Sequence, residues 1–133
     1  MSSAAQGEPV SKKMLWAGWI VSALPVLMLL FSAAIKLAKP AMVADEITRL
    51  GWPESLAVAL GVVELACTIV YVVPPTAVLG AILLTGYLGG ATATHVRSGE
   101  GFIYPVIFGV LVWLGLYLRD PRLRALIPLR RSR

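Results

Sequence analysis

A single acidic side chain within a long apolar segment is the feature of this sequence that most limits how the chain folds. Residues 55–71 read SLAVALGVVELACTIVY, and Glu64 is the only charged residue among them. This segment is long enough to cross most of a bilayer. A carboxylate at the centre of a membrane-spanning helix costs roughly 2.5 to 3.5 kcal/mol to insert. Glu64 therefore needs a partner, a proton or a function.

The composition favours a membrane protein over a soluble one. Hydrophobic residues make up 58% of the 133 residues, which is more than a soluble domain needs. The net charge is +5, but the basic residues stand at the ends of apolar segments. That placement favours contact with the lipid bilayer and its anionic head groups, and we expect no binding of nucleic acid. Cys67 is the only cysteine, so one copy of the chain forms no internal disulfide.

Four apolar segments predict four membrane-spanning helices. We expect them at about residues 15–37, 55–73, 77–94 and 102–118. A helix rises about 1.5 Å per residue and a hydrocarbon core is about 30 Å thick, so these lengths fit a crossing. Residues 40–50 and 121–129 are short and amphipathic, and they predict interfacial helices after the first and fourth spans. The predicted fold class is an all-α membrane protein, a four-transmembrane-helix bundle.

The two ends of the chain predict tails beside one membrane domain. We expect a disordered cytoplasmic tail at residues 1–13, the membrane domain at 14–129 and a basic tail at 130–133. The Lys39-Pro40 pair is expected to end the first span. Four spans put both termini on one side, which then holds eight basic residues against four on the other. This asymmetry predicts a multi-pass protein with both ends in the cytoplasm.

The third predicted span is rich in small residues. Gly86 and Gly90 form a GxxxG pattern, which lets another helix backbone approach closely. The nearest partner for this face is another helix of the same chain, so we predict packing within the monomer. A homodimer formed through the same face is the alternative.

The antiparallel order of the spans brings polar side chains toward one pocket. Glu64 lies about 13 Å below the outer end of its span, and helical side chains lean toward their own N-terminus. Glu64 therefore leans outward, whereas Lys36 and His95, on spans that run the other way, lean inward. We predict a polar ligand-binding pocket in the outer half of the bundle. Its predicted residues are Glu64, Lys36, His95, Thr68, Tyr71, Thr85 and Thr92.

Each principal member of this pocket also has a structural explanation. Glu64 is alternatively a protonated side chain that hydrogen-bonds between helices, and Lys36 alternatively extends to the outer interface. His95 is alternatively an interface residue. The sequence has no nucleophile beside a base, no metal-spaced ligand set and no phosphate-binding loop. We therefore expect no metal, no evident cofactor and no self-contained catalysis.

Several motifs together resemble the DoxX-like family of small bacterial four-helix membrane proteins, over about residues 15–129. They are the lysine that closes the first span, Lys36, the Gly-Trp-Pro of residues 51–53, the Gly61-x-x-Glu64 motif and the glycine-rich third span. The resemblance implies a location in the bacterial inner membrane. The family is named after a small subunit of an archaeal thiosulfate:quinone oxidoreductase, and some relatives are associated with redox-stress membrane complexes or act as assembly chaperones.

The residues and the resemblance leave three hypotheses for function. The first is an accessory subunit or small-ligand binder with a buried polar site around Glu64. The second, implied by the resemblance, is a subunit of a quinone-linked membrane oxidoreductase, with quinone as its cofactor and other redox subunits as partners. The third is a membrane assembly factor or chaperone without a ligand site. The molecule or protein that copurifies with the chain in mild detergent distinguishes the three.

Overall fold

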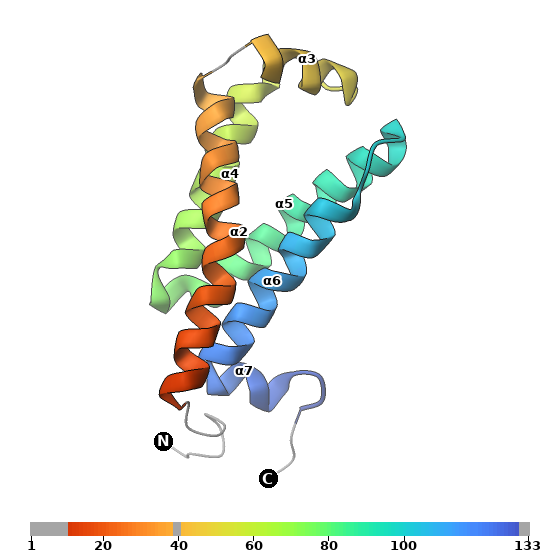
Figure 1. Ribbon diagram of the computed structural model, residues 1–133. Helices are drawn as coiled ribbons and strands as arrows, with labels where there is room; N and C mark the ends of the chain where they lie inside the picture. Colours follow the sequence, from red (N-terminus) through yellow and green to blue (C-terminus); the bar gives the residue numbers. More distant parts are fainter. Residues whose placement is uncertain (1–10, 39–40, 131–133) are drawn as a thin grey trace.

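The described part of the chain is entirely helical in its regular structure (Figure 1). The computed structural model describes residues 11–38 and 41–130. The predicted all-α fold class is confirmed, and each segment predicted as a span or short helix corresponds to a helix in the structure. The elements are α2 (Lys12–Ala38), α3 (Ala41–Arg49), α4 (Leu56–Val72), η1 (Pro74–Thr76), α5 (Ala77–Ser98), α6 (Ile103–Arg119) and α7 (Pro121–Leu126).

Two helix boundaries differ from the predicted ones. Helix α2 begins at Lys12, inside the segment predicted as a disordered tail. Helix α5 continues one turn beyond the predicted end at residue 94, so His95 is helical and does not stand at a loop boundary. The helix continues because its first break is Gly99, whose left-handed φ of 74° ends it. Residues 1–10, 131–133 and the Lys39-Pro40 pair lie outside the described residues.

Local turn and capping residues explain where the short helices begin and end. Gly51, after α3, has a φ of 90°, a conformation that side-chain-bearing residues rarely adopt. Asp120 caps α7 by accepting a 2.9 Å hydrogen bond from the backbone N–H of Arg122, and Pro121 occupies the first turn. These signals place α3 and α7 at opposite ends of the molecule (Figure 1). We call the α3 end the outer end and the α7 end the inner end.

The four long helices pack as two arms that separate toward the outer end. Helix α2 packs against α4 and α6, and α5 packs against α4 and α6. Figure 1 shows α5 and α6 diverging from α2 and α4 as they approach the outer end, where α3 lies across the top. The core cluster, which includes Leu84, Val112 and Leu116, fills the space between the helices below this point.

Glycines explain why the arms close at the inner end. A Cβ added to Gly115 would collide with Ser22 on α2, and one added to Gly80 would collide with the backbone of Tyr71. These positions need glycine because the helices cross in close contact there. By contrast, a Cβ added to Gly86 or Gly90 meets nothing within 4 Å outside its own helix backbone in the described chain. The prediction that this GxxxG face packs within the monomer is therefore wrong, and the homodimer alternative stays a prediction.

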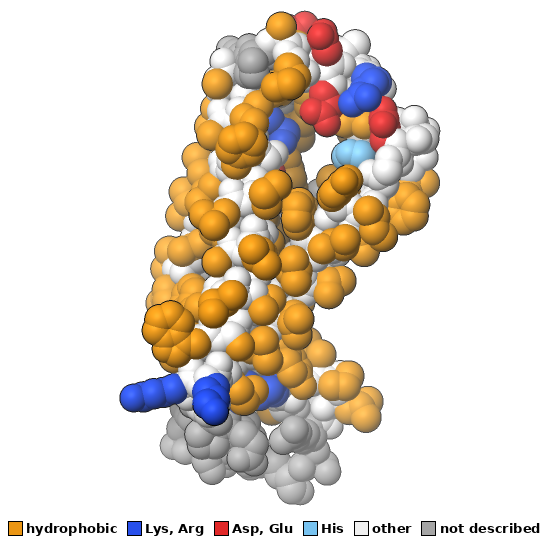
Figure 2. All heavy atoms as spheres, in the orientation of Figure 1, with side chains coloured by type: hydrophobic (Ala, Val, Ile, Leu, Met, Phe, Trp, Pro, Cys, Tyr) orange, Lys and Arg blue, Asp and Glu red, His pale blue; other side chains and the backbone are white. Residues whose placement is uncertain are grey.

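The surface of the long helices is apolar between two charged ends (Figure 2). Large hydrophobic side chains such as Phe31, Val62, Ile82 and Val110 are each more than half exposed. Two helical segments, Lys12–Ala38 and Pro74–Ser98, are long and apolar enough to cross a membrane. Only 22% and 28% of their apolar windows are buried, so most of this apolar surface faces outward.

Candidate functional site

A buried ion pair joins α2 to α4 in the outer half. Lys36 Nζ lies 3.1 Å from Glu64 Oε1, and the side chains are 18% and 3% exposed. Ser32, one turn before Lys36, accepts a 2.6 Å hydrogen bond from Lys36 Nζ and donates one of 3.2 Å to Glu64 Oε1. Lys36 and Glu64 therefore lie together, as the predicted pocket requires, and ligand binding there stays a prediction. Lys36 turns inward to its partner and does not extend to the outer interface.

The local sequence explains why the two side chains meet. Gly61, one turn before Glu64, lets α4 approach Lys36 and the carbonyl of Ala33 on α2, where an added Cβ would lie 3.0 and 3.3 Å from these atoms. Thr68 supports Glu64 indirectly, because its hydroxyl donates a 2.7 Å hydrogen bond to the Glu64 backbone carbonyl. Thr68 is fully buried and does not reach the carboxylate. It therefore positions the helix and does not line a pocket.

Tyr87 contributes a hydroxyl from the opposite arm. It lies on α5 and is partly buried, and it is near enough to the Glu64 carboxylate for an electrostatic interaction. The sequence pattern does not single out Tyr87, although it is the only tyrosine of the third span. Polar groups from α2, α4 and α5 therefore converge on one carboxylate. We call this convergence, with the opening above it, the outer cleft: Ser32, Lys36, Glu64, Tyr87 and His95.

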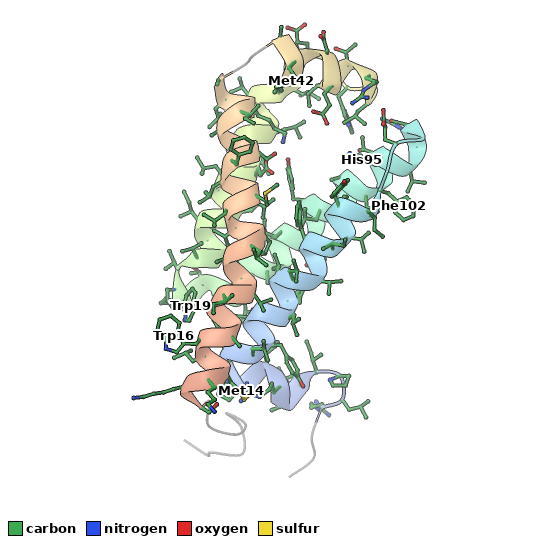
Figure 3. The ribbon with its side chains drawn as sticks, viewed as in Figure 1. Met14, Trp16, Trp19, Met42, His95 and Phe102 are labelled. Carbon is green, nitrogen blue, oxygen red and sulfur yellow. The ribbon has the colours of Figure 1, made fainter. Side chains whose placement is uncertain are left out.

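His95 lies on the α5 side of the opening between the two arms (Figures 2 and 3). Its Nδ1 is 2.7 Å from the carbonyl of Ala91 on its own helix. Since a carbonyl only accepts, Nδ1 carries a proton and donates it to the Ala91 carbonyl. His95 borders the cleft, as predicted, but its hydrogen bond is to α5 and not to Glu64 or Lys36.

A set of contacts bridges the two arms at the outer end, above the cleft. Arg97 and Ser98, at the end of α5, each donate a 3.1 Å hydrogen bond to the carbonyl of Leu50 after α3. The Arg97 guanidinium also lies 5.5 Å from the centre of the Trp52 ring. Arg49 of α3 forms a 3.2 Å ion pair with Glu100. We call these contacts the outer bridge; they hold α3 across the top of the cleft.

Tyr71 belongs to a second polar cluster in the inner half. Its hydroxyl donates to the carbonyl of Val112 at 2.7 Å and lies 2.9 Å from the hydroxyl of Ser22. Arg119 donates to Ser22 at 3.2 Å and stacks on Trp19 at 4.1 Å. The prediction that Tyr71 lines the Glu64 pocket is therefore wrong. Tyr71 lies two helical turns inward of Glu64, where α2 and α6 are close enough to satisfy its hydroxyl.

Thr85 and Thr92 lie elsewhere, in an apolar groove between α5, α6 and α7. Both hydroxyls donate to carbonyls of their own helix, at 2.7 and 2.8 Å, and Thr85 also accepts a 2.6 Å hydrogen bond from Trp113 Nε1. Their predicted place in the Glu64 pocket is wrong because they stand on the side of α5 away from Tyr87. No charged side chain of the described residues lines this groove, so we place the candidate site at the ion pair.

The fold and the cleft define a helical protein whose one buried ion pair, among the described residues, joins α2 to α4 in the outer half. The family comparison agrees with the sequence motifs. The model of the DoxX-like family matches residues 20–115, which is most of the chain and includes Lys36 and Glu64. The chain belongs to the DoxX-like family. Searches of curated proteins and of solved structures gave no match.

Proposed function

We propose that the chain is a four-span protein of the bacterial inner membrane that binds a small ligand in the outer cleft, as an accessory subunit of a membrane complex. Support for the membrane location comes from the apolar surface between two charged ends. Helices α4 and α6 have 17 residues each and are about 26 Å long, close to a hydrocarbon core of about 30 Å. Helix α3 then lies at the outer interface.

The observation that carries the ligand-binding proposal is the buried Lys36–Glu64 pair. Replacing a buried ion pair by apolar residues is often neutral or stabilising, so stability alone gives little reason to keep one. The cost of such groups rises within the apolar part of a membrane. A pair whose lysine side chain remains 18% exposed, with Tyr87 near the carboxylate from the other arm, is suited to hold a polar ligand group.

The quinone-linked alternative fits the described residues in part. A quinone presents two carbonyl acceptors, and Lys36 retains one ammonium proton after its bonds to Ser32 and Glu64. Lys36 and Tyr87 therefore supply donors for one carbonyl. The Nδ1 proton of His95 is already donated to the carbonyl of Ala91, so it does not serve the second carbonyl. The assembly-factor alternative needs no ligand, and there the ion pair is only a contact between helices.

The test of the ligand proposal is what copurifies with the protein in mild detergent. We expect about one organic molecule per chain with the wild type, detected by mass spectrometry. The charge-balanced variant Lys36→Met/Glu64→Gln should retain less than about a tenth of it, because both polar contacts are lost. Asp120→Asn/Arg122→Gln, which removes the ion pair at the inner end while asparagine can still cap α7, is the matched control and should retain it. Equal retention in all three proteins, or no molecule in the wild type, would reject the proposal.

The proposed orientation has its own test. With both termini in the cytoplasm, single cysteines at Ser2 and at Ser132 in a Cys67→Ala background should resist an impermeant thiol reagent added to intact cells. A cysteine at Glu54, between α3 and α4, should be labelled. Labelling of either terminus in intact cells would contradict this orientation.

A further inference from the structure

The first observation concerns which carboxylate oxygen of Glu64 accepts hydrogen bonds. Ser32 and Lys36 both donate to Oε1, and neither donates to Oε2. Tyr87, on the facing arm, is near the same carboxylate. Glu64 as a whole is only 2% exposed, so a ligand that reaches Oε2 must lie inside the outer cleft. An ionised carboxylate only accepts hydrogen bonds, so the ligand group at Oε2 is a donor.

The second observation concerns charge. Lys36 balances Glu64 within the cleft, and Arg49 balances Glu100 at its outer end. A charged ligand head would therefore add an uncompensated charge to a site with little access to water, which is unfavourable. An uncharged donor such as a hydroxyl group adds none.

The third observation concerns the route to the site. The outer bridge ties Leu50 and Arg49 to the end of α5 and the following loop, across the outer end of the cleft. The flank between the arms, by contrast, is open below α3, with hydrophobic side chains along its lower margin and charged side chains and His95 along its outer part (Figure 2). In a bilayer this flank faces lipid chains and not water.

From these observations we infer that the outer cleft binds an uncharged amphiphile from the bilayer, whose hydroxyl head donates to Glu64 Oε2 and whose apolar chain extends through the open flank. This inference rests on the proposed function and names the class of ligand. The outer bridge keeps the head group away from bulk water.

The donor requirement is tested with two probes that differ by one proton. 4-Nonylphenol has a hydroxyl donor, and 4-nonylanisole has a methyl group in its place. In lipid nanodiscs, the phenol should raise the melting temperature of the protein in a saturable way. The anisole should bind at least about tenfold more weakly, because it cannot donate to the carboxylate. Lys36→Met/Glu64→Gln should lose the preference for the phenol.

The route is tested by blocking each opening in turn. Cysteines replacing Arg49 and Glu100, in a Cys67→Ala background, can be joined by a short bifunctional thiol crosslinker to lock the outer bridge. Phenol binding should stay within about twofold of the uncrosslinked protein. Ala91 lies one turn from both Tyr87 and His95, so Ala91→Trp should obstruct the cleft and weaken binding about tenfold or more. The exposed Ala93 is the matched control, and Ala93→Trp should bind normally.

Three results would overturn the inference: equal binding of phenol and anisole, no binding of the phenol, or loss of phenol binding when the outer bridge is locked. If Ala91→Trp fails to fold, the probe comparison and the crosslink still decide. These failures are distinct from failure of the proposed function. If a copurifying molecule depends on Lys36 and Glu64, the cleft is still a ligand site, but for a ligand of another chemical class. If no such molecule copurifies, both the proposed function and this inference are rejected.

Discussion

The inner and outer halves of the bundle both bury polar side chains, but the helices around them touch in the inner half and separate in the outer half. In the inner half, the Tyr71 hydroxyl has two oxygen neighbours, on α2 and α6, and the helices touch at Gly80 and Gly115. In the outer half, Glu64 receives two hydrogen bonds on one oxygen, and the arms separate around it. A polar group enclosed by tight packing indicates a structural role, whereas one beside an opening is available to a ligand.

The largest contrast is expected between glycines of the two regions. Gly80→Leu should abolish folded, monodisperse protein, because a Cβ there collides with the Tyr71 backbone, which has no flexible end to move aside. A Cβ added to Gly90 meets nothing within 4 Å outside its own helix backbone in the described residues, so Gly90→Leu should leave the monomer's folded yield unchanged. The yield of folded, monodisperse protein is measured for both variants by size-exclusion chromatography. If Gly90→Leu were as damaging as Gly80→Leu, that face would have a partner, and the homodimer alternative would gain support.

The two tyrosines give a smaller contrast. Tyr71→Phe should cost about 1 to 3 kcal/mol of stability, because the buried carbonyl of Val112 loses its side-chain donor. Tyr87→Phe should cost less, since Tyr87 borders the cleft, but it should weaken retention of the copurifying molecule. Thermal denaturation in detergent and mass spectrometry give the two measurements. The reverse pattern would exchange the roles assigned to the two halves.

The sequence predicted the fold more completely than it predicted the site. Helix positions follow from runs of apolar residues and from local signals such as Asp120-Pro121 and Gly51, all of which lie close together in the chain. The Lys36–Glu64 contact was also predictable, because helix direction and side-chain lean bring these two residues together.

Whether the remaining residues reach the site depends on how each helix is rotated about its axis. Helices with apolar residues on every face carry no sequence signal for that rotation. Tyr71, Thr85 and Thr92 were therefore placed in the wrong region, and Tyr87 was missed. Thr85 is two positions from Tyr87 and stands on nearly the opposite side of α5. Arg119 was counted only as an inner basic residue, although it stacks on Trp19 and hydrogen-bonds Ser22.

The central claim is that Lys36 and Glu64 act as one coupled pair beside the outer cleft, and a double-mutant cycle tests it most directly. Thermal stability in detergent is measured for the wild type, Lys36→Met, Glu64→Gln and the double variant. Each single change leaves one buried polar partner uncompensated, so the double change should cost less than the sum of the two, by about 0.5 to 3 kcal/mol. Additivity within about 0.5 kcal/mol, with Lys36→Met nearly silent, would contradict the account.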